Sequence, residues 1–215
     1  WIGPITWFHG VTTSPVAQRT VQTLCDACDT PGGPQLRVSG TIGGNVCNAA
    51  TSADTASTLL AYGALLDVRS VRGTRTIPIG EWYTGPGSCV RERDEVLVGI
   101  RIPRASYEGW TGHYFKYGKR RALEIATMGC CCLVRLSADK ARVEDIRLAF
   151  GVAAPTPIRA RGAEDGVRGL TVADAAEKIG LLAQRDTSPR DSWRASREFR
   201  LQLIKEMSRR SLVEA

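Results

Sequence analysis

The chain has 215 residues, of which 43% are hydrophobic and 24% charged, and its net charge is +7. This composition is ordinary for a folded globular protein, so it argues against a disordered chain, a collagen-like repeat or a coiled coil. No apolar run approaches the roughly 20 residues of a transmembrane helix, and no signal peptide is visible. The net positive charge is compatible with binding to an anionic ligand, an acidic partner or nucleic acid.

Signals for a strand and a helix open the chain. Residues 2–11 are typical of a strand that runs into a loop. Ser14 is placed to cap a helix that Pro15 opens, and apolar side chains on one face continue it to about Cys28. A break rich in glycine and proline follows at 30–34.

A second helix and three strands complete the first half. The helix is expected over 52–63, with Thr51 or Ser52 as its cap. Two β segments follow, and the spacing around their glycine turn predicts a hairpin. The segments of the first half are 65–70 and 74–79 for the hairpin and 95–103 for an alternating strand. The polar, turn-rich residues 104–112 are expected to link two domains.

The second half shows strands followed by helices. The three strands are expected at 113–117, 129–136 and 143–150. Thr171 is placed to cap one helix, and a last helix is expected from about Ser192. Strands and helices that are segregated in this way predict an α+β fold with two units.

The pattern richest in chemistry is a glycine pair followed by polar side chains. Gly43 and Gly44 allow backbone N–H groups to approach a ligand closely, and such a loop before a helix suits a phosphate. Asn45 and Asn48 add neutral hydrogen-bonding groups, and Asp54 could accept a hydrogen bond from a sugar or a ring N–H. Spacing alone fits a plain glycine turn before a capped helix equally well.

Other candidates favour ordinary structural roles. Cys25 and Cys28 have the CxxC spacing, but no second pair supports a zinc site, so we expect small residues packed on a helix. In the run 130–132, strand alternation sends Cys131 to the face opposite its neighbours, which argues against one shared metal. With no nucleophile motif and no paired carboxylates, we expect no catalytic residue and no metal on this chain, and any chemistry to come from a cofactor.

Five motifs in sequence order resemble the FAD-binding subunit of the xanthine dehydrogenase family, the molybdenum hydroxylases. They lie at 35–54, 94–97, 115–122, 151–159 and 194–196. The likeness is greatest to the separate flavin subunit of bacterial three-subunit xanthine dehydrogenases. It implies that 1–103 is the C-terminal portion of a two-subdomain FAD-binding domain of the vanillyl-alcohol-oxidase/PCMH type. By the same likeness, 104–112 is a linker and 113–215 a small α+β domain with an antiparallel sheet and helices.

The resemblance also implies roles for particular residues. Backbone N–H groups of 41–45 and the Asn45 side chain would bind FAD, and Leu97 would pack near the flavin. Lys116 would contact the flavin end, where a cation stabilises the anionic reduced ring. The cofactor-binding residues implied are Thr41, Ile42, Gly43, Gly44, Asn45, Asn48, Asp54, Leu97 and Lys116.

A reaction and its partners follow from the same likeness. Electrons from the oxidation of a purine, xanthine or hypoxanthine, would leave a molybdenum cofactor on one partner chain. They would pass through two-iron two-sulfur clusters on another, reach FAD here and continue to NAD. Seven cysteines without a secretion signal favour a reduced, cytoplasmic setting over a disulfide framework.

The sequence departs from the family at one place. The family has an earlier glycine-rich loop upstream of the strand that residues 2–5 resemble, and this sequence does not contain it. We therefore expect the N-terminal part of the FAD-binding domain to be missing. Two alternatives stay open: a truncated interaction module that keeps subunit contacts but not FAD, and a basic nucleic-acid-binding protein. The basic residues of the last helix favour a solvated face or a subunit contact.

Overall fold

A computed structural model describes all residues from 1 to 215. The helices are α1 (Phe8–Thr12), α2 (Pro15–Thr20), α3 (Gln22–Cys28), α4 (Pro34–Arg37), α5 (Ile42–Cys47), α6 (Asp54–Ala61), α7 (Arg161–Val167), α8 (Val172–Arg185) and α9 (Arg197–Glu214). The strands are β1 (Leu65–Ser70), β2 (Gly73–Pro78), β3 (Tyr83–Gly85), β4 (Ser88–Cys89), β5 (Val96–Arg101), β6 (Thr111–Tyr117), β7 (Met128–Leu136), β8 (Val143–Gly151) and β9 (Ile158–Arg159). None of the helices combines the length and apolar character needed to span a bilayer.

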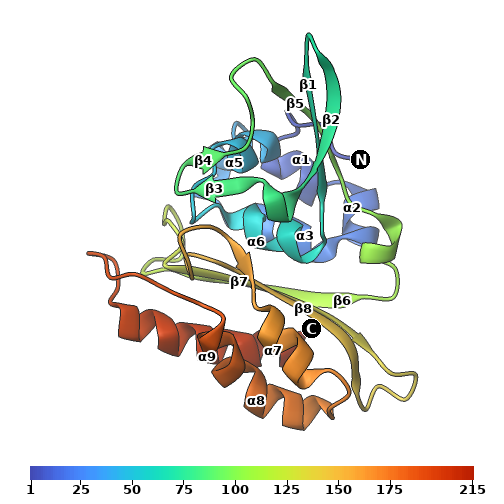
Figure 1. Cartoon of the computed structure of the whole chain (residues 1–215), viewed down its shortest axis with the longest axis vertical. Coiled ribbons are helices and arrows are strands. Elements are labelled where there is room, and N and C mark those ends of the chain that lie inside the picture. Colours follow the sequence, from blue (N-terminus) through green and yellow to red (C-terminus); the bar gives the residue numbers. More distant parts are fainter.

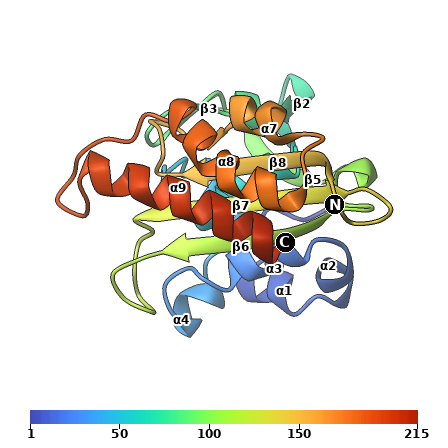
Figure 2. The ribbon, with the colours of Figure 1, turned by 90° about the horizontal axis from the view of Figure 1, so that it is seen from below.

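Two sheets organise the molecule (Figure 1). A three-stranded antiparallel sheet in the order β2-β1-β5 lies beside the helices of the first half. A four-stranded antiparallel sheet in the order β6-β7-β8-β9 lies below it. Helices α3 and α6 cover one face of this second sheet (Figure 1). Helices α7, α8 and α9 cover the other face (Figure 2). The α+β fold with antiparallel sheets is therefore confirmed.

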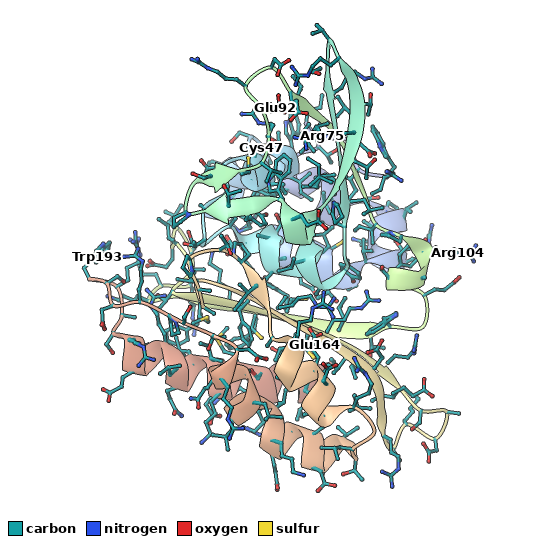
Figure 3. The ribbon with its side chains drawn as sticks, viewed as in Figure 1. Cys47, Arg75, Glu92, Arg104, Glu164 and Trp193 are labelled. Atoms are coloured by element: carbon teal, nitrogen blue, oxygen red, sulfur yellow. The ribbon has the colours of Figure 1, made fainter.

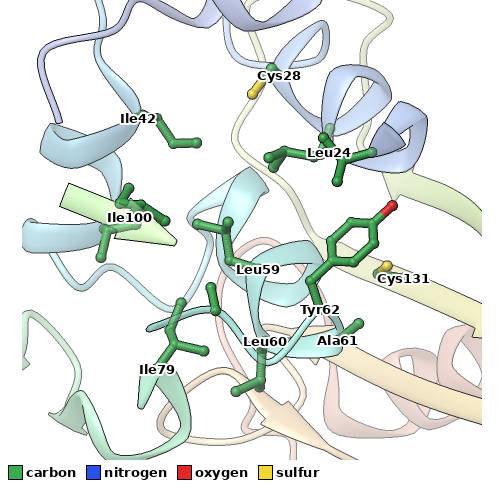
Figure 4. Packing of buried hydrophobic residues seen from close by; sticks show 14 of the residues in the cluster. Leu24, Cys28, Ile42, Leu59, Leu60, Ala61, Tyr62, Ile79, Ile100 and Cys131 are labelled. Carbon is green, nitrogen blue, oxygen red and sulfur yellow. The ribbon is translucent and has the colours of Figure 1, made fainter. Parts of the chain in front are cut away.

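The second sheet is a wall shared by two hydrophobic cores. Cys130 and Cys132 pack into the core under α8 and α9, whereas Cys131 packs into the first core beside Tyr62 (Figure 4). Successive side chains of a strand point to opposite faces, which is why the three cysteines divide in this way. The predicted alternation is confirmed, and it shows that β7 is buried on both faces.

Most of the predicted boundaries are confirmed within two residues. The hairpin β1–β2 and the strands β5, β6, β7 and β8 all form where their patterns lie. Ser14 and Thr171 cap α2 and α8 through their hydroxyl groups, which accept from the backbone N–H groups of Ala17 and Asp174. Local capping chemistry was sufficient to place these helix starts.

Four local predictions are wrong. Residues 8–12 form α1 and not a loop, and the stretch before them makes only isolated bridges, from Ile2 to Ile100 and from Trp7 to Thr41. Val21 interrupts the first predicted helix, because its extended φ and its burial in the core separate α2 from α3. The cap of α6 is Ala53, with no side-chain bond. The last helix starts at 197, since a turn occupies the residues before it.

The predicted linker is partly structured. Residues 104–106 form a 3-10 turn, and β6 already begins at Thr111. Arg147 of β8 reaches across and donates to the carbonyls of Ala61 and Ser106 at 3.2 and 3.4 Å. Its guanidinium also stacks 4.1 Å from the ring centre of Trp110. These contacts fasten the second sheet to the first half of the chain.

We expect Glu95→Gln to destabilise the protein near neutral pH but not in acid. Glu95 is buried and accepts two bonds from Arg75, at 2.6 and 2.8 Å, and one from the N–H of Glu92. These bonds lower the pKa of Glu95 to about 2. A depressed pKa contributes stability above the unfolded value of about 4.3, and this stability disappears as the pH falls through about 2.

Chemical unfolding at a series of pH values measures this effect. The free-energy difference between wild type and Glu95→Gln should be constant near neutrality and shrink below about pH 4. The exposed Glu81→Gln is the matched control and should show no such trend. A difference that is independent of pH would contradict the assigned ion pair.

Candidate cofactor site

Two adjoining cavities lie where the first half of the chain meets β6. The apolar cavity, of about 510 Å³, has Phe8, Leu36, Leu123 and Ile125 among its walls. The basic cavity, of about 400 Å³, contains Arg37, Lys116, Lys119, Arg120 and Arg121, together with Asp29 and Glu124. Glu124 borders both cavities. The pair thus offers apolar walls on one side and positive charge on the other.

A buried ionic cluster lies between the two cavities. Asp54, the first residue of α6, pairs with the Lys116 ammonium through Oδ2 at 3.1 Å. Its Oδ1 accepts from the Tyr114 hydroxyl at 3.2 Å, and Lys116 also donates to the Thr30 carbonyl at 3.0 Å. Tyr114 and Lys116 are two residues apart on β6, so both side chains point to the same face, toward α6. The cluster joins the two halves of the chain.

Burial dominates the electrostatics of Asp54. The Asp54 residue is 8% exposed, and desolvation raises the pKa of its carboxyl group although Lys116 and Tyr114 each lower it. Burial of an ion is costly unless opposite charge and hydrogen bonds compensate for it. Both oxygens of Asp54 are engaged in this way. The cluster is therefore stable only while all three groups are present.

The glycine pair does not form the open loop expected from the sequence. Residues 42–47 form the short helix α5, and the Thr41 hydroxyl caps it by accepting from Gly44 N–H at 3.0 Å. The N–H groups of Ile42 and Gly43 donate to the carbonyls of Thr6 and Pro4. A Cβ at position 43 would lie 2.4 Å from the Pro4 carbonyl oxygen, so close backbone packing explains this glycine.

The two asparagines do face the apolar cavity. Both Asn45 and Asn48 line it together with Asp54. Asn45 Oδ1 accepts from the Thr55 hydroxyl at 2.6 Å, while its amide nitrogen has no partner within the chain. Asn48 is exposed and makes no side-chain hydrogen bond to the protein. Two amide groups are thus available to a ligand in this cavity.

The remaining predicted site residues lie apart from the cavities. Leu97 is 5% exposed on β5 and belongs to the first core. Ile42 is fully buried in the same core. The structure therefore brings together Asn45, Asn48, Asp54 and Lys116, and it leaves Leu97 and Ile42 as packing residues.

Sequence reasoning missed Tyr114 and the apolar walls of the cavity. A strand signal with Lys116 on one face already implied that Tyr114, two residues earlier, shares that face. Leu123, 65% exposed, is held across the site by the bond from its N–H to the Gly32 carbonyl. No local signal in the sequence announced that contact, because it joins segments about ninety residues apart.

The cysteines and histidines form no metal centre. No group of three or more His, Cys, Asp or Glu side chains is placed to hold a metal ion. All seven cysteines are free, and Cys25 and Cys28 are buried in the first core. Burial, with a smaller contribution from Asp26, raises the pKa of Cys25 to about 11, so its thiol is unreactive near neutrality.

Comparisons with known proteins decide the family. The putative xanthine dehydrogenase FAD-binding subunit XdhB of Escherichia coli K12 is 43% identical over 215 residues, which is 100% of this chain and 73% of that protein. The chain belongs to the family of xanthine dehydrogenase FAD-binding subunits. Family models described as the FAD binding domain in molybdopterin dehydrogenase and the CO dehydrogenase flavoprotein C-terminal domain match residues 1–105 and 113–215.

More distant relatives share the same architecture. The carbon monoxide dehydrogenase medium chain of Hydrogenophaga pseudoflava is 27% identical and covers 100% of this chain and 74% of its own. A crystal structure of the Cu,Mo-CO dehydrogenase superposes with a TM-score of 0.93 at 26% identity, with the same coverage. This xanthine dehydrogenase family member is thus an oxidoreductase subunit with FAD on this chain.

The residues around the two cavities fit FAD chemically. A dinucleotide needs cations near its phosphates and apolar surface against its rings. The basic cavity supplies Lys116 and several arginines, and the apolar cavity supplies Phe8 and Leu36. The free amide groups of Asn45 and Asn48 add hydrogen-bonding capacity. The lining of the two cavities is therefore compatible with FAD.

We expect Tyr114→Phe to destabilise the protein by about 1–3 kcal/mol, because a buried carboxylate oxygen loses its donor. The same change should raise the pKa of Asp54 further, since Tyr114 now lowers it. A raised carboxyl pKa contributes stability that is present below the unfolded value and lost as the pH rises through the folded value. The pH at which this stabilising contribution disappears should therefore be higher in Tyr114→Phe than in wild type.

The measurement is the free energy of unfolding as a function of pH for wild type, Tyr114→Phe and Asp54→Asn. Asp54→Asn should remove this component of the pH dependence. Tyr107→Phe, which removes a hydroxyl group that makes no side-chain hydrogen bond here, is the matched control. Identical pH profiles for wild type and Tyr114→Phe would contradict the role given to Tyr114.

Proposed function

We propose that this subunit passes electrons through FAD in a molybdenum hydroxylase that oxidises a purine. In this proposal the electrons come from a molybdenum-binding chain through two-iron two-sulfur clusters on another chain, and NAD accepts them. The observation that carries the proposal is the buried Asp54–Lys116–Tyr114 cluster between an apolar and a basic cavity. The 43% identity to the E. coli xanthine dehydrogenase subunit supports the purine substrate. The seven free cysteines support a cytoplasmic location.

Particular residues would hold the cofactor. FAD, when bound, supplies reversible storage of two electrons between the partner centres. Asn45 and Asn48 would donate amide hydrogens to it from the apolar cavity. Lys116 would place a positive charge beside its ring, and Asp54 would keep that ammonium in position. The other residues implied by the resemblance, Thr41, Ile42, Gly43, Gly44 and Leu97, line neither cavity; of these, Thr41 and Gly43 would contribute by holding α5, which carries Asn45, in place.

The domain division belongs to the same proposal. Residues 1–103 would form the C-terminal portion of the FAD-binding domain and 113–215 the C-terminal domain. The two hydrophobic cores on opposite faces of the second sheet support this division. The cofactor would then lie across the boundary, in contact with both parts.

The decisive experiment begins with the full gene product, purified and then denatured. We expect release of one FAD for each polypeptide, measured by absorbance and chromatography. Co-expression with a molybdenum-binding subunit and an iron–sulfur subunit should yield a complex that reduces NAD with xanthine. A complex that contains FAD but oxidises another substrate would overturn the purine part, and absence of FAD would overturn the whole proposal.

One observation favours a second candidate function. The N–H groups of Ile42, Gly43, Gly44 and Asn45 are all bonded within the chain, so they are not free for a phosphate. An interaction module that keeps subunit contacts without FAD would have this feature. Isothermal titration of residues 1–215 and of the full gene product with FAD separates the two, because tight binding by both rejects the module.

A further inference from the structure

An exposed tryptophan marks the segment between α8 and α9. Trp193 is 79% exposed and lies at the outer end of this segment (Figure 3). The Lys119 ammonium lies 5.6 Å from the centre of its ring, and the Arg194 guanidinium lies 4.3 Å away. Phe199, six residues after Trp193 and 42% exposed, packs edge-on against Tyr117 of β6. Two large aromatic side chains are thus held in place at the surface by their neighbours.

The charge around Trp193 is unbalanced. Residues 119–124 and 190–200 together carry seven basic and three acidic side chains. Of the seven basic side chains, only Arg120 forms an ion pair, with Glu124. Asp191 accepts from the Arg197 backbone N–H at 2.7 Å, so this carboxylate is already engaged. Six cations therefore have no carboxylate partner.

Arg200 shows the imbalance most clearly, because it is only 2% exposed. It donates to the Thr127 carbonyl and, at 3.0 Å, to the Ser192 hydroxyl, but no carboxylate contacts it. Burial and the charges of Arg190 and Arg194 lower its pKa. The Nε atoms of Arg194 and Arg200 are buried without a hydrogen-bond partner. Burying a donor without a partner costs free energy, so an added acceptor with negative charge would stabilise this region.

We propose that this Trp193 surface, formed by Lys119, Arg190, Trp193, Arg194 and Phe199, docks an acidic face of the iron–sulfur subunit. The inference rests on the proposed function, which supplies that subunit. Tryptophan and arginine are the residues that most often dominate binding energy at protein interfaces. Carboxylates from a partner would neutralise cations that have no counter-charge in this chain, and complementary charge would also speed association.

The position of the surface explains why the partner would be an electron donor. Lys119 contacts Trp193 and also lines the basic cavity, which contains Lys116. A chain docked on the Trp193 surface would therefore sit beside the Lys116 end of the cofactor site. Asp191 and Glu198 interrupt the positive charge, so the surface offers a patch and not a continuous track for a phosphate backbone.

The test uses the full gene product and the separately purified iron–sulfur subunit. Surface plasmon resonance at low and high salt gives the association rate and the dissociation constant. Trp193→Ser should weaken binding about tenfold or more, because a central aromatic contact is lost. Arg190→Glu should slow association and reduce its salt dependence, because a steering charge is reversed. Lys178→Glu, on the exposed side of α8, is the charge-matched control and should change neither.

FAD content and thermal unfolding of each variant separate this inference from the proposed function. Weaker binding with normal FAD content and stability supports the inference. Unchanged binding by Trp193→Ser and Arg190→Glu would overturn it. Variants that lose self-association or binding to duplex DNA, but still bind the iron–sulfur subunit normally, would also overturn it. A wild-type protein without FAD that still binds the iron–sulfur subunit through Trp193 would overturn only the proposed function.

Discussion

Replacing Lys116 with methionine is expected to destabilise the protein by about 3–5 kcal/mol, because removal of one partner from a buried ion pair leaves the other charge uncompensated. The side chains of Lys116 and Asp54 are only 11% and 9% exposed, so solvent cannot take over the role of the partner. We also expect FAD affinity to fall about tenfold or more, since the cation proposed to lie beside the flavin ring is lost. Urea unfolding and fluorescence titration with FAD measure the two effects.

The double variant separates the fold from the cofactor. In Lys116→Met/Asp54→Asn neither member of the pair is charged, so much of the lost stability should return. FAD affinity should stay low, because the ammonium is still absent. Recovery of both stability and FAD binding in the double variant would show that Lys116 serves only the fold. Lys140→Met, at an exposed turn, is the matched control.

Glu164→Ala should destabilise the C-terminal half by a similar amount, about 3–5 kcal/mol. Glu164 is 1% exposed and accepts from Arg159 Nε and Nη2 at 2.8 and 2.7 Å. Its Oε1 also accepts from the backbone N–H of Leu148 on β8 at 2.9 Å. The alanine variant would therefore leave both a largely buried guanidinium and a backbone donor without partners. Thermal and urea unfolding report the loss.

Two companion variants sharpen that result. Glu164→Gln keeps an oxygen acceptor for Leu148, so its cost should be smaller than that of the alanine variant. Glu177→Ala, exposed on α8 and without an ion pair, should stay within about 0.5 kcal/mol of wild type. If the three variants were equally stable, the contacts of Glu164 would not be holding α7 on the sheet.

Most of the fold could be predicted because its signals are local. The capping hydroxyls of Ser14 and Thr171 and the alternation in the strands depend on neighbours a few residues away. The same alternation divided the three consecutive cysteines between two cores. The predictions were wrong where long-range contacts determine the local structure. At Val21, burial in the core breaks a helix that the spacing of apolar residues favours.

The candidate site divides in the same way. The sequence by itself determined the α+β class, several residues of the candidate site and, through ordered motifs, the family. Only the tertiary structure decided that Asp54 meets Tyr114 and Lys116, since these residues lie about sixty positions apart and nothing local encodes their distance. It also decided that the N–H groups of Ile42 and Gly43 are occupied by the carbonyls of Thr6 and Pro4. Burial and charge compensation arise from packing, so they become visible only when distant segments are brought together.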